Sequence, residues 1–451
     1  MAGTFFDSGT GVLGVTGPAR TIFGHRNLTA EGLYVAAVVA LASASAGFWW
    51  LRRSAFGRAL ALARHHRGAA EACGIATTRL RTLTFVLGAA ITGVAGSLSG
   101  AFLRFAGPDS IGAAKGLELL SVAVIGGLGS LYGPLLGALI VTGIPEALQP
   151  LADYQMLITG SAFLLVLFRQ ARPRRPGRWP VPADHRARAV ADAPPPARSD
   201  PPAVIKAAAD APLLDAEGMV KRFGGVVAVD GASLRVLPGQ IHGLVGPNGS
   251  GKSTLIDLLT GLQRADAGRL RLGGAEITSR AAHRRARLGL HRTFQLGSLT
   301  PLLSVGANVA LGAWTSPDPD AEARRALALL GVGTSVDAAP GSLATAARRL
   351  AEVARAVAGS PRLVVLDEPA AGLDEEAREV LVRAIRAVRD RGAAVLLVEH
   401  DVDLVLEVSD VVTVMDAGAV VATGPPAVVV ADPVARTAYF GDALHQAGAV
   451  S

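Results

Sequence analysis

The chain has one cysteine, Cys73, and little lysine, with 4 Lys against 40 Arg among its 451 residues. A single cysteine excludes a disulfide framework and excludes a zinc or iron–sulfur site built from several cysteines. Charged residues make up only 18% of the chain and hydrophobic residues 50%, which excludes a disordered chain and is unusual for a soluble enzyme. A chain of this length is expected to form two or more domains.

The excess of positive charge lies at the front of the chain. Residues 1–170 hold 12 basic against 7 acidic residues, residues 171–212 hold 8 against 4, and residues 213–451 hold 24 against 26. Basic residues beside apolar segments are typical of the cytoplasmic flank of a membrane protein. We therefore expect membrane lipid around the front of the chain and no nucleic-acid partner.

Four apolar stretches lie within residues 1–170: 33–51, 83–103, 119–145 and 154–168. The first two run for 19 and 21 residues without a charge, close to the ~20 that a bilayer-spanning helix needs. Buried helices of a soluble protein are the alternative, which these charge-free lengths disfavour. We predict a transmembrane region over residues 1–170.

Arginine predicts how this region is oriented. Segment 52–82 holds seven Arg against Glu71 alone, and five more Arg follow residue 168, so both places should face the cytoplasm. If 83–103 and 154–168 each cross once, 119–145 must return to its starting side, as two short helices or as a hairpin. Residues 1–32 would then lie outside, and they contain no signal-peptide pattern.

Beyond the membrane region the composition changes twice. Residues 171–212 are a predicted Pro/Arg-rich linker, since they hold ten prolines and no long apolar run. From residue 213, short apolar runs alternate with helical patterns, which predicts an α/β domain with a largely parallel sheet. The expected strands are 241–245, 363–366 and 394–398, and the expected helices are 252–262, 346–358 and 375–390.

A glycine-rich loop, GPNGSGKST, follows the strand-like IHGLV and precedes a helical pattern. Strand, glycine loop and helix in this order predict a phosphate-binding P-loop, in which backbone N–H groups surround phosphate oxygens. Lys252 is expected to hold the β- and γ-phosphates of ATP, and Ser253 to ligate Mg²⁺. The predicted binding residues are Gly246, Pro247, Asn248, Gly249, Ser250, Gly251, Lys252, Ser253 and Thr254.

Two further apolar runs end in residues that can perform chemistry. LVVLDEP ends in Asp367 and Glu368, and VLLVEHD ends at His400. Asp367 is expected to bind Mg²⁺, directly or through water, and Glu368 to polarise an attacking water. A solvated acid pair and a structural histidine are the alternatives, but α/β sheets bind ligands at such strand ends.

These motifs, in this order, resemble the nucleotide-binding subunit of an ABC transporter over residues 213–451. KRFGGVVAVDGAS resembles the adenine-stacking loop, with Phe223 as the ring, and RTFQ resembles the Q-loop, with Gln295 at the Mg²⁺ and water position. AAGLD resembles the D-loop, with Asp374, and VEHD supplies the switch residue His400. The resemblance implies that Lys252, Gln295, Glu368 and His400 are catalytic. The sequences of these motifs are most similar to those of importers of branched-chain amino acids and of urea or short amides.

The front of the chain resembles the later part of a permease subunit from such importers. TGPAR, FGRALALARHHRGAAEACGI and VIGGLGSLYGPLLGALI carry this resemblance. It implies a coupling helix around Glu71, Ala72 and Gly74 that docks on the ATPase, with a basic amphipathic surface helix as the alternative. A family permease has more helices, so we expect that another chain supplies them or that the true start lies upstream.

The ABC signature departs from the family pattern. Aligning ARRLAEVARAV on the family's helix places the usual LSGGQ at Leu343, Ala344, Thr345, Ala346 and Ala347. The serine hydroxyl and the bare glycine backbone that approach the γ-phosphate of the opposite subunit's nucleotide are then missing. We expect a heterodimer in which this chain's P-loop forms the one dominant hydrolytic site.

The sequence thus predicts a mixed fold: an N-terminal α-helical transmembrane region, and a C-terminal α/β P-loop NTPase domain with a helical subdomain near 296–360. The expected function is ATP-driven import of branched-chain amino acids across the inner or plasma membrane, with the ATPase in the cytoplasm. The expected partners are a second ATPase subunit, a second permease subunit and an extracytoplasmic substrate-binding protein. A urea or short-amide importer, an exporter half-transporter and a non-transporting regulatory ABC protein are the alternatives.

Overall fold

The chain forms two compact units in the computed structural model. One consists of Met1–Phe56 with Arg81–Gly177, and the other of Gly57–Leu80 with Arg178–Ser451. Residues 57–80, which the sequence division grouped with the membrane region, thus belong to the second unit. The predicted linker and the apolar stretch 154–168 lie almost wholly outside the described residues. The structure describes residues 12–13, 30–103, 105–106, 112–127, 132–143, 160–161, 164, 211–294 and 297–440.

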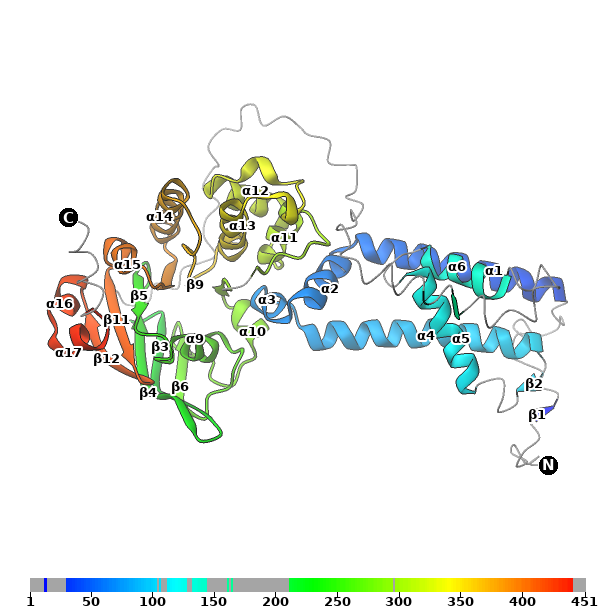
Figure 1. Ribbon diagram of the computed structural model, residues 1–451, viewed down its shortest axis with the longest axis horizontal. Helices are drawn as coiled ribbons and strands as arrows, with labels where there is room; N and C mark the ends of the chain where they lie inside the picture. The colour runs from blue at the N-terminus through cyan, green and yellow to red at the C-terminus, as the bar shows by residue number, and fades with distance from the viewer. Residues whose placement is uncertain are drawn as a thin grey trace. The chain divides into compact units, whose positions relative to one another are not determined.

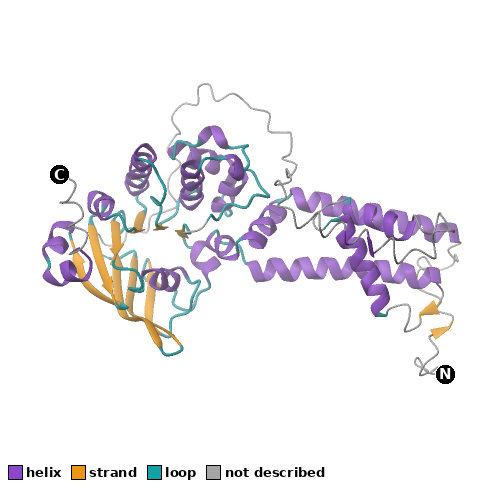
Figure 2. Cartoon of the chain, in the orientation of Figure 1, coloured by secondary structure: helices purple, strands orange, loops and turns teal. Residues whose placement is uncertain are grey.

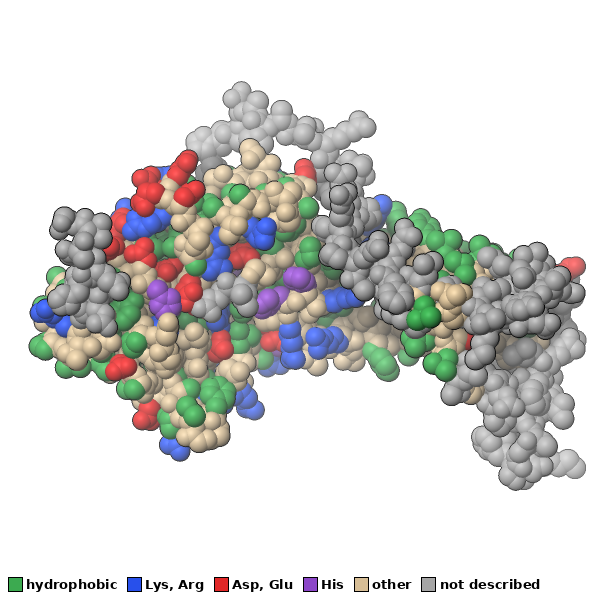
Figure 3. Space-filling model, viewed as in Figure 1, with side chains coloured by type: hydrophobic (Ala, Val, Ile, Leu, Met, Phe, Trp, Pro, Cys, Tyr) green, Lys and Arg blue, Asp and Glu red, His purple; other side chains and the backbone are tan. Residues whose placement is uncertain are grey.

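The first unit is helical (Figures 1 and 2). Within the described residues, two helices have the length and composition to span a membrane, Glu31–Arg53 and Thr77–Phe102. Their apolar side chains are exposed, as on a surface that faces lipid, and green apolar side chains are visible on the part of this unit that is not grey in Figure 3. The elements are β1 Val12–Leu13, α1 Ala30–Arg53, α4 Thr77–Leu103, β2 Phe105–Ala106, α5 Ala113–Gly126, α6 Gly133–Ala138 and the π-helical turn Leu139–Gly143.

The described residues of the apolar region 119–145 form two short helices, while the return of this region to its starting side stays a prediction. The helix α5 ends at Gly126 and α6 begins at Gly133. Their backbones touch where they cross, since a Cβ on Gly133 or Gly137 would overlap the carbonyl oxygens of Gly126 and Val122 respectively. Small residues permit such close helix packing in membranes.

The second unit contains two sheets (Figure 1). A six-stranded sheet in the order β12-β11-β5-β10-β9-β8 is parallel except for its edge strand β12, and an antiparallel sheet in the order β4-β3-β6-β7 was not predicted. The strands are β3 Leu214–Phe223, β4 Val226–Val236, β5 Ile241–Val245, β6 Ala267–Leu272, β7 Ala275–Glu276, β8 Leu290–Arg292, β9 Leu363–Asp367, β10 Ala394–Val398, β11 Val411–Asp416 and β12 Ala419–Gly424.

Helices cover the sheets and form the predicted helical subdomain, which consists of α11, α12 and α13 (Figure 1). The helices of this unit are α2 Ala55–His65, α3 Arg67–Ala72, α9 Lys252–Thr260, α10 Ala282–Ala286, α11 Val305–Ala310, α12 Pro319–Leu329, α13 Thr345–Val357, α14 Glu375–Asp390, α15 Val402–Val408, α16 Pro426–Ala431 and α17 Pro433–Ala435. Short 3₁₀ turns occupy Leu311–Ala313, Gly333–Ser335 and Pro340–Ser342, and a π-helical turn occupies Arg436–Phe440.

The central strands are buried on both faces, which is why they read as continuous apolar runs. In β9, Val364 and Leu366 belong to one hydrophobic cluster while Leu363 and Val365 belong to the other. The parallel register also aligns the strand ends, because Val398 of β10 pairs with both Asp367 of β9 and Leu244 of β5. The loops after β5, β9 and β10 therefore leave from the same edge of the sheet.

The free energy of unfolding of this unit depends on pH through one buried histidine, His242. His242 in β5 is fully buried, with its Nε2 2.8 Å from Thr413 Oγ1, and burial lowers its pKa to about 4. The unfolded chain takes up this proton near pH 6.5. As pH falls from 6.5 to 4, His242 therefore removes up to about 3 kcal/mol of unfolding free energy, with no further loss below pH 4.

We expect His242→Gln to be less stable at neutral pH but to lose less stability between pH 6.5 and pH 4 than the wild type. Circular-dichroism melts of the full chain in detergent across this range would measure it. His65→Gln, at an exposed position on α2, is the control and should keep the wild-type slope. Equal slopes for wild type and His242→Gln would contradict the assignment.

Candidate active site

The glycine loop runs from the end of β5 to the first residue of α9, as predicted. Gly251, the residue before α9, has a φ of 97°, and a Cβ there would overlap the carbonyl oxygen of Ala228 in β4. Glycine is required at this position for both reasons. Pro247, Asn248 and Gly249 are half-buried or exposed. The loop thus sets backbone N–H groups at a helix N-terminus, where an anion is stabilised.

Lys252 lies inside this loop. Its Nζ donates hydrogen bonds to the carbonyl oxygens of Gly246 (2.7 Å) and Pro247 (2.8 Å), and its side chain is buried. Burial lowers the pKa of Lys252, while the nearby Glu368 and Asp367 carboxylates raise it. An arriving phosphate would offer this ammonium stronger acceptors than two neutral carbonyls.

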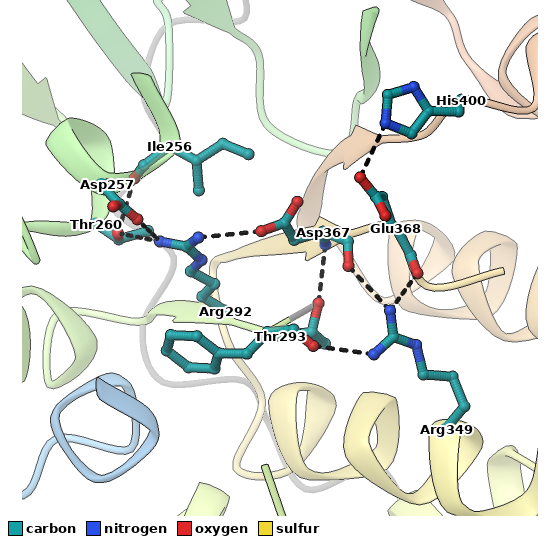
Figure 4. A network of polar contacts seen from close by, with 10 residues as sticks. Ile256, Asp257, Thr260, Arg292, Thr293, Arg349, Asp367, Glu368 and His400 are labelled. Carbon is teal, nitrogen blue, oxygen red and sulfur yellow. Dashed lines mark hydrogen bonds and ion pairs between the residues drawn. The ribbon is translucent and has the colours of Figure 1, made fainter. Parts of the chain in front are cut away.

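The two acids and the histidine meet at the shared sheet edge (Figure 4). Asp367 is the last residue of β9, Glu368 follows it, and His400 lies two residues beyond β10. The Nε2 atom of His400 lies 2.9 Å from Oε1 of Glu368. Because a carboxylate oxygen only accepts, this nitrogen carries the proton, and the histidine holds the carboxylate in one orientation.

Glu368 has a strained backbone that its neighbours hold in place. Its φ of 47° lies in the left-handed region, which a residue with a Cβ rarely adopts. The N–H of Glu368 donates to the carbonyl of Val398 at 2.8 Å, and Arg349 donates to the carbonyl oxygen of Glu368. Such strain collects at functional sites, and here it accompanies the residue predicted to act as the base.

Arg292 is a member of the site that sequence reasoning missed. It ends β8, and its Nη2 donates to Oδ2 of Asp367 at 3.0 Å, while its Nη1 pairs with Asp257 on α9 (Figure 4). Burial raises the pKa of Asp367, and Arg292 opposes this. The available signal was the arginine in RTFQ, where only the glutamine was assigned a role.

Glu399 is a second missed residue, and it connects two loops of the site. Its side chain is buried and accepts the N–H of Ala370 at 2.6 Å and that of His400 at 3.1 Å. Burial raises the pKa of Glu399, and these two hydrogen bonds oppose the shift. The motif VEHD contained this residue, but only its histidine was interpreted.

Three charged residues of α13 hold both sides of the predicted Q-loop, although Gln295 itself lies outside the described residues. Arg349 donates to the carbonyl of Phe294 at 3.0 Å. Glu352 accepts the N–H of Ser298 at 2.7 Å, and Arg355 donates to the carbonyl of Ser298 at 2.8 Å. All three charged residues are buried, and their i, i+3, i+6 spacing on one helix face was a signal in the sequence that went unused.

Comparisons with known proteins identify the family of this chain. Residues 229–371 match a family described as "ABC transporter", and residues 5–167 match "Branched-chain amino acid transport system / permease component". The branched-chain amino acid transport ATP-binding protein BraF of Pseudomonas aeruginosa is 34% identical over 252 residues, which cover 99% of it and 51% of this chain. The chain belongs to the ABC transporter family.

Other similar proteins carry different substrate names. The ribose import ATP-binding protein RbsA 1 of Rubrobacter xylanophilus is 37% identical over 217 residues, which cover 47% of this chain and 44% of that protein. The chain thus spans about half the length of the ribose import relatives it matches. A solved ATP-binding cassette of an ABC transporter, in its ADP conformation, is 29% identical, covers 51% of this chain and all of its own, and has a TM-score of 0.47.

Within the ABC transporter architecture, an N-terminal permease region precedes an α/β ATPase unit with its helical subdomain. Phe223 ends β3 and is half-exposed, with the ammonium of Lys221 5.5 Å from its ring centroid. The carboxylate of Asp374 caps α14 by accepting the N–H of Ala377 at 3.0 Å. Both residues predicted from motif resemblance thus lie on the surface of this unit.

The five positions aligned with the ABC signature surround the start of α13. Ala344 is the residue that caps this helix, and its side chain makes no capping hydrogen bond. Ala344 and Thr345 are exposed, whereas Leu343, Ala346 and Ala347 pack against the hydrophobic core of the unit. An alanine cap leaves the first N–H groups of α13 without the side-chain oxygen that Ser would provide.

Segment 57–80 packs on the ATPase within the second unit. The helix α3 ends in a tight turn at Gly74, whose φ is 83°, and the carbonyl of Gly74 accepts Arg287 Nε from the end of α10 at 2.9 Å. The His66 ring lies 4.9 Å from the Phe294 ring. The carboxylate of Glu71 accepts hydrogen bonds from Arg67 Nε and Thr77 Oγ1. Ala72 is the last residue of α3. The next residue, Cys73, is buried, and this burial raises the pKa of its thiol. Of the positions predicted from permease resemblance, Gly74 thus contacts the ATPase at Arg287, while His66 at the start of α3 contacts Phe294.

Glu368→Gln should lower ATP hydrolysis by at least about 100-fold while ATP binding persists, because an amide cannot accept the proton of an attacking water. Hydrolysis by the full chain in complex with its partner ATPase subunit, measured beside the binding of a fluorescent ATP analogue, checks this. Glu376→Gln, at an exposed acid in the first turn of α14, is the control. Hydrolysis by Glu368→Gln within twofold of the wild type would show that another group is the base.

Proposed function

We propose that this chain couples ATP hydrolysis to the import of a branched-chain amino acid. The permease region would lie in the plasma or inner membrane, surrounded by lipid, and the ATPase unit in the cytoplasm. The observation that carries the proposal is the convergence of Lys252, Glu368 and His400 at one sheet edge, on a chain whose front matches a permease component. An idle, regulatory protein would have no reason to retain this arrangement.

ATP would bind with its phosphates on the P-loop and its adenine on Phe223. Lys252 would exchange its two carbonyl partners for β- and γ-phosphate oxygens. Glu368, oriented by His400, would accept a proton from the attacking water, with Gln295 helping to orient that water. Binding and positioning then supply most of the catalysis, because phosphoryl transfer needs little covalent help from the protein.

The residues at the loop fit a magnesium ion. One carboxylate oxygen of Asp367, Oδ1, is buried and has no hydrogen-bond partner within the described part of the chain, and Ser253, the second residue of α9, is exposed. Oxygen ligands of this kind, completed by phosphates and water, suit Mg²⁺. Asp367 and Ser253, with Gln295, would hold the ion, which would neutralise charge on the phosphates.

The substrate class is inferred from the permease region, because that region and not the ATPase meets the substrate. Its family match names branched-chain amino acids, whereas the names of the ATPase relatives include ribose, branched-chain amino acids, sulfate or thiosulfate, and lipopolysaccharide. The motifs also resemble those of importers of urea and short amides, and import of these substrates would proceed by the same mechanism. An extracytoplasmic binding protein would deliver the substrate to this chain and a second permease subunit.

A second ATPase subunit would complete the nucleotide site. Each signature serves the nucleotide of the opposite subunit, so the alanines at 344, 346 and 347 weaken the partner's site and leave this chain's own P-loop intact. A heterodimer with one dominant hydrolytic site follows. The uncapped start of α13 supports this view, since no side-chain oxygen of residue 344 is available to a phosphate.

The segment with α3 would act as the coupling helix. Two contacts between this segment and the ATPase support the proposal. Arg287 donates to the carbonyl of Gly74, and the ring of Phe294 contacts the ring of His66. Phe294 directly precedes Gln295, so a movement at the nucleotide would reach α3 through one residue. The Pro/Arg-rich residues 171–212 would serve as the linker between the permease and ATPase domains.

Lys252→Ala should abolish uptake of labelled leucine by cells that express the chain with its partners, because ATP phosphates lose their main cation. Uptake of labelled urea, measured in parallel, separates the two substrate classes. Arg284→Ala, at an exposed position of α10, is the matched control and should transport normally. Unchanged uptake of both substrates in Lys252→Ala would favour the non-transporting alternative.

Arg287→Gln should reduce the leucine taken up per ATP hydrolysed by a few-fold. The lost hydrogen bond to Gly74 is worth about 1 kcal/mol, or about fivefold in the docking equilibrium. Uptake and hydrolysis measured on the same proteoliposomes give this ratio, and Arg284→Gln on the same helix is the control. A ratio equal to the wild type would show that this contact does not contribute to coupling.

A further inference from the structure

Arg292 occupies a position that the proposed mechanism does not use. It is the last residue of β8, next to β9 in the sheet, and its side chain is almost fully buried. Its guanidinium makes two separate ion pairs, one with Asp257 on α9 and one with Asp367 at the end of β9 (Figure 4). It therefore links the helix that follows the P-loop with the strand that carries the predicted magnesium ligand.

Two further contacts hold the guanidinium group of Arg292 in place. Nη1 of Arg292 also lies 3.3 Å from Thr260 Oγ1 at the end of α9. Its central carbon lies 5.0 Å from the centroid of the Phe294 ring, which provides a cation–π contact and fixes the guanidinium plane. A planar group held on three sides fixes the orientation of a carboxylate more firmly than the rotatable ammonium of a lysine.

The two oxygens of Asp367 differ in their surroundings. Oδ2 accepts Arg292 Nη2 at 3.0 Å, while Oδ1 is buried and has no hydrogen-bond partner among the residues that the structure describes. The backbone N–H of Asp367 is also fixed, since it donates to Thr293 Oγ1 at 2.9 Å. The carboxylate is thus prevented from rotating, and one oxygen stays open. A buried acceptor without a partner is costly, so its retention points to a ligand.

We infer that Arg292 is a positioning residue that occupies Oδ2 of Asp367 and so presents Oδ1 to the magnesium ion of MgATP. This inference rests on the proposed function, because the carboxylate meets the ion only if the site binds MgATP. It adds a partner behind the metal ligand, anchored to the P-loop helix through Asp257. Such partners orient ligands and tune the affinity of metal sites.

The decisive variant is Arg292→Lys, which keeps a positive charge but replaces the rigid planar guanidinium with a rotatable ammonium. Binding of a fluorescent, non-hydrolysable ATP analogue to the full chain in detergent is titrated with Mg²⁺. We expect the Mg²⁺ concentration at half-maximal effect to rise by about 10- to 100-fold, the usual cost of losing such a partner. Binding of the same analogue in EDTA should stay unchanged, because the P-loop contacts do not involve Arg292.

Asp257→Asn provides a gentler second variant, since Asp257 is partly exposed and its loss leaves the pair of Arg292 with Asp367 in place. It should shift the Mg²⁺ midpoint in the same direction by a few-fold. Arg285→Lys is the matched control: Arg285 is equally buried and donates to the carbonyl oxygens of Leu258 and Leu259 on the same helix. Its Mg²⁺ midpoint should equal that of the wild type.

The outcomes separate this inference from the proposed function. A shifted midpoint in Arg292→Lys with normal binding in EDTA supports the inference. An unshifted midpoint overturns it, and so does an unshifted Asp257→Asn if Arg292→Lys fails to fold. Equal shifts in Arg285→Lys would also overturn it, by showing a general effect of a damaged core. A wild-type chain that binds no analogue would instead contradict the proposed function.

Discussion

The parallel pairing of β10 with β5 and β9 is the constraint on which the site depends. In a parallel ladder the strands run side by side in the same direction, so their carboxyl ends reach one edge together. That edge collects a loop from residues 246–251, an acid pair from residues 367–368 and a histidine at residue 400, which are far apart in the chain. No local interaction could bring them together without this sheet.

Buried arginines hold the loops that leave this edge. The loops carry carbonyl groups and carboxylates that have no partner in the sheet, and a guanidinium satisfies several of them at once. Arg349 and Arg355 do this from α13, and Arg292 does it from β8. Arginine keeps its charge when buried: even the lowered pKa of Arg285, about 10, leaves it protonated at neutral pH. This role is consistent with the excess of arginine over lysine.

Local features of the fold could be predicted from the sequence, whereas long-range contacts could not. The predicted strands 241–245 and 394–398 and the predicted helix 375–390 coincide with β5, β10 and α14, because continuous apolar runs and amphipathic periodicity are local signals. The antiparallel sheet was missed, since β3 and β4 are bulged and their burial does not alternate cleanly. The pair of Arg292 with Asp367 was missed because 75 residues separate its partners.

The ATPase unit is built from two separated pieces of chain, and this changes how its docking should be understood. Residues 57–80 pack on the rest of this unit through the ring contact at Phe294, the hydrogen bond from Arg287 and several fully buried side chains, among them Leu62, Ala69 and Ala70. On one chain the same contacts form in a first-order step, at an effective concentration that dilution cannot lower. An interface that opened during a transport cycle would therefore re-form on the same chain. An ATPase piece prepared without residues 57–80 would leave Phe294 uncovered and would have to find its permease from solution.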